Sequence, residues 1–244
     1  MPKNVLRYSF PPAEQADENG IVAIGGNLDS EHLLAAYERG IFPWPHADLP
    51  LLWFCPDPRF VLYPREIHLS KSLVKKMRRS PLMVRADRNF GQVIRQCAQI
   101  PRPDQPGTWI NEEIMSGYRD LHALGYAHSI EAYNGEKLVG GLYGVSLGKT
   151  FFGESMFTLE ADAAKIAFTC LVAQLIKWKF HFIDCQAHTR HLERFGAKFV
   201  ARKQFLSQLR NSLKRSSKIG EWNLELTPIE AVEYINAHAA LHHR

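Results

Sequence analysis

The sequence predicts an α+β fold, because a run of antiparallel strands is followed by alternating helices and strands. Asn134-Gly135 separates two apolar runs and is a strong hairpin signal. Gly148-Lys149 separates the second run from a third. A length of 244 residues also favours one large domain with a smaller companion. The three strands are expected at residues 127–133, 137–147 and 150–157.

Residues 1–62 are predicted to form the small N-terminal domain, and residues 63–244 the larger domain with a C-terminal extension. The small domain is expected to hold a helix at 30–39, with Ser30 as N-cap and Gly40 as its end. The prolines and aromatic residues that follow predict a fixed, extended segment.

The larger domain begins with a basic segment. Residues 65–102 carry ten Lys or Arg residues against two acids, a net charge of +8, so the rest of the chain is slightly acidic against the overall +5. A helix capped by Ser70 is expected to place its basic residues on the outside. Such a concentration of charge fits a polyanionic partner such as nucleic acid, although a solvated helix face explains it as well. The basic residues are Lys71, Lys75, Lys76, Arg78 and Arg79.

Further helices are expected at 90–99, at 111–124 with Asn111 as N-cap, and at 161–178. A buried strand at 180–186, a helix ending at Gly196 and a last strand complete the pattern. A meander followed by helix, strand, helix and strand is the order of the GNAT-like acyltransferase fold, which by itself identifies no substrate.

The chain has no apolar run long enough to cross a membrane. Its first residues lack a secretory signal, and four scattered cysteines fit a reducing compartment. A soluble, cytoplasmic protein without a membrane partner is therefore expected, with free thiols and no metal site.

The segment ESMFTLEADAAK, at the start of the helix after the meander, decides against one cofactor. In GNAT-like enzymes a glycine-rich loop at this place holds the pyrophosphate of coenzyme A. Here no glycine follows Gly153 until Gly196, and Glu160 and Asp162 would repel a phosphate. An acyl group is therefore expected to arrive on another carrier.

Six stretches stand out, in this order along most of the chain: AAYERGIFPWP, LLWFCPDPR, GTWI, LHALGYAHSIE, LVGGLYGVSLGKTFFGESMF and IDCQ. Together they resemble the leucyl/phenylalanyl-tRNA–protein transferases. The resemblance implies an enzyme that moves Leu or Phe, and less readily Met, from aminoacyl-tRNA to the α-amine of proteins beginning with Arg or Lys, in an N-degron pathway. It implies no cofactor and no metal.

The resemblance implies that Asp184 and Gln186 are the catalytic pair. In a strand they share a face, so the carboxylate is expected to orient the amide, whose oxygen accepts from the attacking amine. Glu154 is expected to attract the amine or the cationic side chain of the acceptor. The alternatives are a polar strand end for the pair, and a structural ion pair of Glu154 with Lys149 or Lys165.

The resemblance also implies an apolar pocket for the transferred side chain, although periodicity alone assigns the same residues to the core. Ile183 conflicts with strand alternation unless the strand bends. The pocket residues are Leu142, Met156, Phe168, Leu171, Leu175 and Ile183.

Four aromatic residues are implied to surround the terminal adenosine, by stacking that is typical of single-stranded ends. They are Trp44, Trp109, Tyr37 and Tyr118, with ordinary packing as the alternative for each. The five basic residues would contact tRNA phosphates. A coenzyme A acetyltransferase and a noncatalytic RNA-binding module remain as alternative functions.

Overall fold

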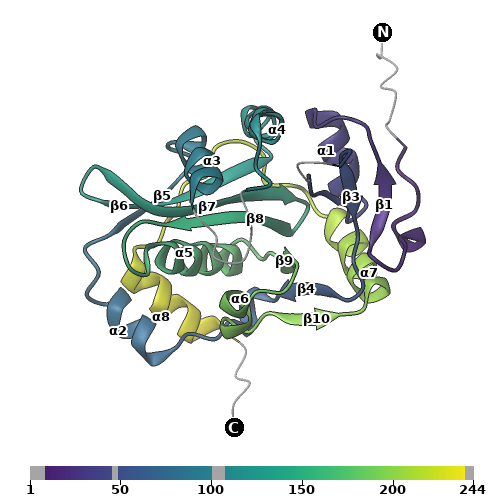
Figure 1. Cartoon of the computed structure of the whole chain (residues 1–244). Coiled ribbons are helices and arrows are strands. Elements are labelled where there is room, and N and C mark those ends of the chain that lie inside the picture. Colours follow the sequence, from purple (N-terminus) through teal and green to yellow (C-terminus); the bar gives the residue numbers. More distant parts are fainter. Residues whose placement is uncertain (1–8, 46–48, 101–107, 240–244) are drawn as a thin grey trace.

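The computed structural model describes residues 9–45, 49–100 and 108–239. The start of the sequence and most of the loop before Trp109 lie outside these ranges. Within them the strands form two sheets, and helices cover the larger one (Figure 1). The predicted α+β class, with a small N-terminal domain before a mixed-sheet domain, is confirmed.

The small domain is built on an antiparallel sheet with the order β1-β3-β2. Its helix has Asp29 as N-cap, whose side chain accepts from the backbone N–H of His32, so the expected cap at Ser30 is wrong by one residue. The elements are η1 (Ala13–Gln15), β1 (Ile21–Ile24), α1 (Ser30–Tyr37), β2 (Phe42–Pro43) and β3 (Leu52–Phe54).

The larger sheet has the order β10-β4-β9-β8-β7-β6-β5. Its pairs are antiparallel except β8 and β9, which run parallel. The strands are β4 (Arg59–Leu62), β5 (Met83–Ala86), β6 (Ala127–Asn134), β7 (Lys137–Leu147), β8 (Thr150–Thr158), β9 (Phe182–Gln186) and β10 (Lys198–Val200).

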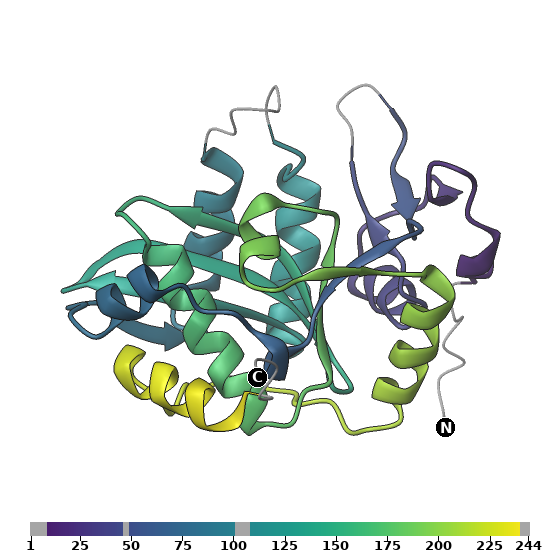
Figure 2. The ribbon, with the colours of Figure 1, turned by 90° about the horizontal axis from the view of Figure 1, so that it is seen from below.

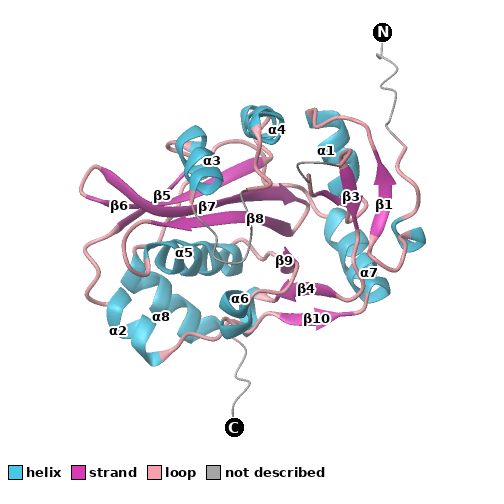
Figure 3. Cartoon of the chain, in the orientation of Figure 1, coloured by secondary structure: helices cyan, strands magenta, loops and turns pink. Residues whose placement is uncertain are grey.

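Helices cover both faces of this sheet. Figure 3 shows α3 and α4 on one face, and α5 with α8 and α2 on the other. Each face has its own apolar cluster, one shared with the small domain and one centred on α5. The helices are η2 (Pro64–Glu66), α2 (Lys71–Met77), α3 (Phe90–Gln99), α4 (Glu112–Ala123), α5 (Ala163–Lys177), α6 (Arg190–Arg194), α7 (Arg202–Leu213) and α8 (Pro228–His238).

Local signals predicted several helix ends correctly. The side chains of Ser70 and Asn111 cap α2 and α4 as expected. Gly125 follows α4 with a φ of 79°, a conformation that glycine adopts at little cost. The sequence did not predict β4, β5, α7 or α8.

The two domains meet along α7, which lies beside the small domain (Figure 2). Gly40 packs against Phe205, and the guanidinium of Arg202 donates to the carbonyl of Cys55. β4 belongs to the larger sheet, whereas the expected boundary after residue 62 would assign this strand to the small domain; the domain boundary stays a prediction.

Candidate active site

The parallel strands β8 and β9 part inside the larger sheet. Their last paired residues are Phe152 and Asp184. Glu154 and Gln186 each lie two residues farther on, and a side-chain hydrogen bond from the Gln186 amide to Glu154, at 2.8 Å, spans the opening. The separation of the strands thus places a carboxylate and an amide face to face.

A β-bulge in β8 positions Glu154. Gly153 pairs with Gly144 and Ser155 with Tyr143, which leaves Glu154 as the extra residue. A bulge turns a side chain away from the regular alternation and is common beside active sites. This explains why a charged residue can lie near the end of an otherwise buried strand.

A second bulge shapes β9. Asp184 pairs with Val61 and Gln186 with Phe60, so Cys185 is the extra residue, and Gln186 has a φ of 61°. The strand therefore bends after Asp184, but Ile183 and Asp184 still point to opposite sides of the sheet: Ile183 packs in the second apolar cluster, whereas the Asp184 carboxylate meets Arg59.

Three neutral groups donate to the Glu154 carboxylate. The hydroxyl of Tyr37 donates to Oε1 at 2.7 Å, that of Tyr118 to Oε2 at 3.0 Å, and the Gln186 amide also to Oε1. The two hydroxyl oxygens also lie within hydrogen-bonding distance of each other, and with one proton each they can donate in only two of these three contacts at a time. Lys165 is paired with Asp162 instead, so the alternative of a structural ion pair between Lys165 and Glu154 is not supported.

The surroundings of Glu154 shift its pKa toward neutral pH. The pKa of Glu154 is raised to about 7, mainly by burial. The charge of Asp184 also raises this pKa, whereas the three donors lower it. Burial and the nearby Glu154 charge raise the pKa of Tyr37 and of Tyr118 well above 10, so both remain donors. The carboxyl can therefore take up and release a proton near pH 7.

Asp184 is fully buried and paired with Arg59 of β4. The guanidinium Nε donates to Oδ1 at 2.8 Å and Nη2 to Oδ2 at 2.6 Å. Oδ1 also accepts the backbone N–H of Gln186 at 2.9 Å. Asp184 thus fixes the main chain of Gln186. This contact agrees with the alternative interpretation, in which polar residues at the end of the strand satisfy local backbone groups.

The expectation that Asp184 orients the side-chain amide of Gln186 is wrong. Glu154 orients the amide, because Gln186 Nε2 donates to it. Within the described part of the chain no donor is found on Gln186 Oε1. That oxygen can accept from a substrate.

The four aromatic residues differ in exposure. Trp44 and Trp109 are half-buried at the edge of the first apolar cluster and can offer part of a ring to a base. Tyr37 and Tyr118 are 0% exposed, and their rings pack against Phe152 and Tyr143. The stacking expected of the two tyrosines is therefore corrected: they act on Glu154 through their hydroxyls.

The six expected pocket residues lie together in or against the second apolar cluster. Leu142 and Met156 face each other across β7 and β8, and Met156 is two residues from Glu154. Five of the six are at most 3% exposed, whereas Met156 is half-buried. They form apolar interior beside the site, and their use as a pocket stays a prediction.

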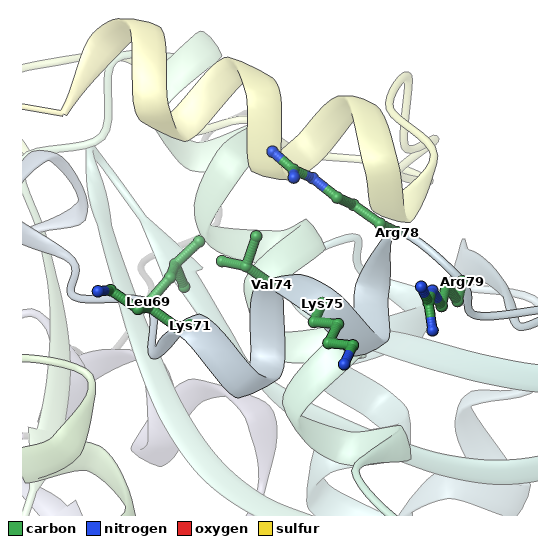
Figure 4. Close-up of a pocket in the computed structure, with 6 residues that line it drawn as sticks. All are labelled: Leu69, Lys71, Val74, Lys75, Arg78 and Arg79. Atoms are coloured by element: carbon green, nitrogen blue, oxygen red, sulfur yellow. The ribbon is translucent and has the colours of Figure 1, made fainter.

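The five expected phosphate contacts are all exposed on α2 or the residues just after it. Four of them line a hollow of about 380 Å³. Figure 4 shows Arg78 extending toward α8, and Lys75 and Arg79 pointing away from it. Lys76 is ion-paired with Asp162, which joins α2 to the start of α5.

The start of α5 offers little to a pyrophosphate. The N–H of Ala164 donates to the Thr158 hydroxyl at 3.0 Å, and that of Ala163 to the carbonyl of Glu160. Asp162 adds a carboxylate at the same place, paired with Lys165 and Lys76.

Arg59 is a site residue that was not selected from the sequence. Tyr37 and Tyr118 were selected for their rings, whereas the structure places their hydroxyls in the site. Arg59 lies within the stretch LLWFCPDPR, but its partner Asp184 is 125 positions away and no local pattern joins them. An arginine among apolar residues was the one available signal.

Neither a membrane-spanning helix nor a cluster suited to a metal ion is found in the residues described. The four cysteines are free thiols, as expected.

The fold and the site define an α+β enzyme with a carboxylate and an amide joined where two strands part. Models of the leucyl/phenylalanyl-tRNA protein transferase and of its N-terminal domain match residues 61–210 and 26–57. The chain belongs to the leucyl/phenylalanyl-tRNA protein transferase family, and it is a transferase.

Curated relatives agree with this assignment. A protein of Myxococcus xanthus is 53% identical over 213 residues, which cover 87% of this chain and 91% of the relative. Proteins of an Anaeromyxobacter species and of Syntrophus aciditrophicus are 51% and 50% identical, over 89% and 88% of this chain and 92% and 90% of theirs. All three are named leucyl/phenylalanyl-tRNA–protein transferase.

Proposed function

We propose that this chain transfers Leu or Phe, and less readily Met, from aminoacyl-tRNA to the α-amino group of proteins that begin with Arg or Lys. The modified proteins would enter N-degron degradation in the cytoplasm. The names of the relatives support the donor and the kind of acceptor. The observation that carries the proposal is the bridge between Glu154 and Gln186 at the opening of the strands.

The reaction needs a neutral amine, yet an α-amine with a pKa of about 8 is mostly protonated at neutral pH. Glu154, with a pKa of about 7, takes the proton from the ammonium group. Gln186 Oε1 accepts a remaining N–H and directs the lone pair of the amine toward the ester carbonyl. The C–N bond forms, the C–O bond to the 3′ ribose breaks, and the ribose oxygen leaves with the second proton that the attacking nitrogen gives up as it becomes an amide. No cofactor takes part.

Positioning supplies much of the rate, because the ester is already activated and alignment of two reactants contributes up to roughly 7 to 11 kcal/mol. Trp44 and Trp109 would hold the terminal adenosine, and the basic residues of α2 the phosphates. Met156, with its flexible thioether, would admit either Leu or Phe into the apolar cluster.

One experiment tests the donor and the acceptor together. The protein is incubated with labelled Phe-tRNA and an Arg-initiated peptide, and in parallel with an Ala-initiated peptide and with acetyl-coenzyme A. We expect label only on the Arg-initiated peptide and only from the tRNA. Acetylation of the peptide would support the coenzyme A alternative, and tRNA binding without transfer would support an RNA-binding module.

Replacing Tyr37 with phenylalanine should move the pH dependence of transfer to higher pH. The Tyr37 hydroxyl lowers the pKa of Glu154, so its loss raises that pKa above about 7, and the carboxylate form is reached only at higher pH. Single-turnover rates between pH 5.5 and 9 measure the midpoint. Tyr63→Phe, which removes a half-buried hydroxyl bound to Gln208, is the control. A midpoint that stays in place or falls in Tyr37→Phe would contradict the role of the hydroxyl.

Reversing the charge of Lys75 and Arg79 together should weaken tRNA binding. Each phosphate that the protein no longer neutralises reduces the slope of log affinity against log salt by about 0.7 to 0.9. Titrations with Phe-tRNA at several salt concentrations provide this slope. Lys137→Glu with Lys214→Glu makes the same charge change at two other exposed sites. Equal salt slopes for the two double variants would show that α2 does not bind phosphates.

A further inference from the structure

Arg59 is a buried charge at the junction of the two domains. It is 0% exposed, and its guanidinium lies between the rings of Phe42, at 4.6 Å, and Phe205, at 4.5 Å. Phe42 belongs to the small sheet and Phe205 to α7. A buried ion pair contributes little net stability compared with apolar packing, so the pair with Asp184 calls for another explanation.

The contacts of Arg59 lead directly to the proposed reaction centre. Both carboxylate oxygens of Asp184 are held by the guanidinium, and Oδ1 also accepts the N–H of Gln186. Gln186 has a left-handed φ of 61°, a conformation that non-glycine residues keep only when neighbouring contacts hold it. The Gln186 amide then reaches Glu154.

We propose that Arg59 is a positioning residue for aminoacyl transfer. It acts through Asp184, which holds Gln186 in the turn that directs the Gln186 amide oxygen at the attacking amine. The inference rests on the proposed function. It extends the site to β4, and through Phe42 to the small sheet. Phe42 also packs beside Trp44, at 6.3 Å between ring centroids, so the base expected on Trp44 and the amide of Gln186 are joined by continuous contacts.

The geometry requires arginine and not merely a positive charge. A planar guanidinium forms two parallel hydrogen bonds to one carboxylate and offers two flat faces to aromatic rings, whereas an ammonium group has neither a fixed planar fork nor a flat face. Arg59→Lys keeps the charge beside Asp184 but loses the fork. It therefore separates positioning from simple charge compensation.

The test compares Arg59→Lys with wild type and with Arg202→Lys, which changes another arginine of the junction, one that binds the Cys55 carbonyl. Rates of transfer from Phe-tRNA to an Arg-initiated peptide are measured at saturating and limiting tRNA. We expect kcat of Arg59→Lys to fall roughly 10- to 100-fold, as for a misplaced catalytic group. The KM for Phe-tRNA should stay near the wild-type value, and Arg202→Lys should retain kcat. A kcat that is unchanged in Arg59→Lys, or a loss confined to KM, would overturn the proposal.

A double-mutant cycle tests whether Arg59 acts through Asp184. If Arg59 acts through Asp184, the variant with both Arg59→Lys and Asp184→Asn loses no more kcat than the worse single variant. Multiplied losses would overturn the proposal. Failure of the wild-type protein to transfer Phe from tRNA would refute the proposed function itself, whereas normal transfer by Arg59→Lys refutes only the role of Arg59.

Discussion

We expect Glu154→Gln to lower the rate of aminoacyl transfer by roughly 10²- to 10⁴-fold, the usual range for loss of a general base. Glutamine keeps the shape and can still meet Tyr37 and Gln186, but it cannot take a proton. The wild-type rate should fall as the pH drops through about 7, because protonation of Glu154 removes the acceptor. In Glu154→Gln this dependence disappears, and only that of the amine, near pH 8, remains.

Glu131→Gln is the matched control for this change. Glu131 is also a buried carboxylate of the larger sheet that accepts from neutral donors, namely the hydroxyls of Ser129 and Tyr133 and the N–H of Asn89. Single-turnover rates from pH 5.5 to 9 compare the two variants. A Glu154→Gln variant that keeps the wild-type dependence near pH 7 would show that another group accepts the proton.

We expect Asp184→Ala to slow transfer far more than it weakens tRNA binding. The change removes both acceptors from the buried Arg59 and releases the N–H of Gln186, so the turn that holds the amide is lost. Breaking a buried ion pair from one side also lowers the free energy of unfolding by about 3 to 5 kcal/mol. Urea unfolding, tRNA binding and transfer rates on the same preparation separate these effects.

The control for Asp184→Ala is Glu225→Ala, which removes an acid from a pair with Lys177 at the surface. Exposed pairs contribute about 0.2 to 1 kcal/mol, so this variant should remain close to wild type in all three measurements. If Asp184→Ala reduced transfer and tRNA binding equally, this result would contradict a role of Asp184 in orienting the acceptor amine.

The parts of the fold that follow from local signals could be predicted from sequence. The Asn134-Gly135 turn has β6 and β7 on either side, and the strands agree with the expected ranges to within a residue or two. The cap at Ser70 and the end at Gly125 are local as well. In each case the residues that decide the structure are neighbours in the chain.

The features missed depend on residues far apart in the sequence. β4 is only four residues long and joins the sheet between β9 and β10, which come much later in the chain. The bulges at Glu154 and Cys185 follow from the register between strands, which the pattern of apolar residues does not reveal. For the same reason the bond from Gln186 to Glu154 could not be foreseen, although both residues were selected.

Tyr37 and Tyr118 illustrate a different limit. An aromatic residue in a matching stretch can offer its ring or its hydroxyl, and sequence does not distinguish the two uses. Here burial decides, because both rings are covered and both hydroxyls reach Glu154.

The titration of Glu154 tests the central claim most directly. Carbon NMR of protein labelled at the glutamate carboxyl carbons, compared between wild type and Glu154→Gln, identifies the Glu154 signal. Its chemical shift is then followed from pH 4 to 9. We predict a midpoint at about 7; a midpoint near 4.5, the ordinary value for glutamate, would contradict a carboxyl that accepts the proton of the amine.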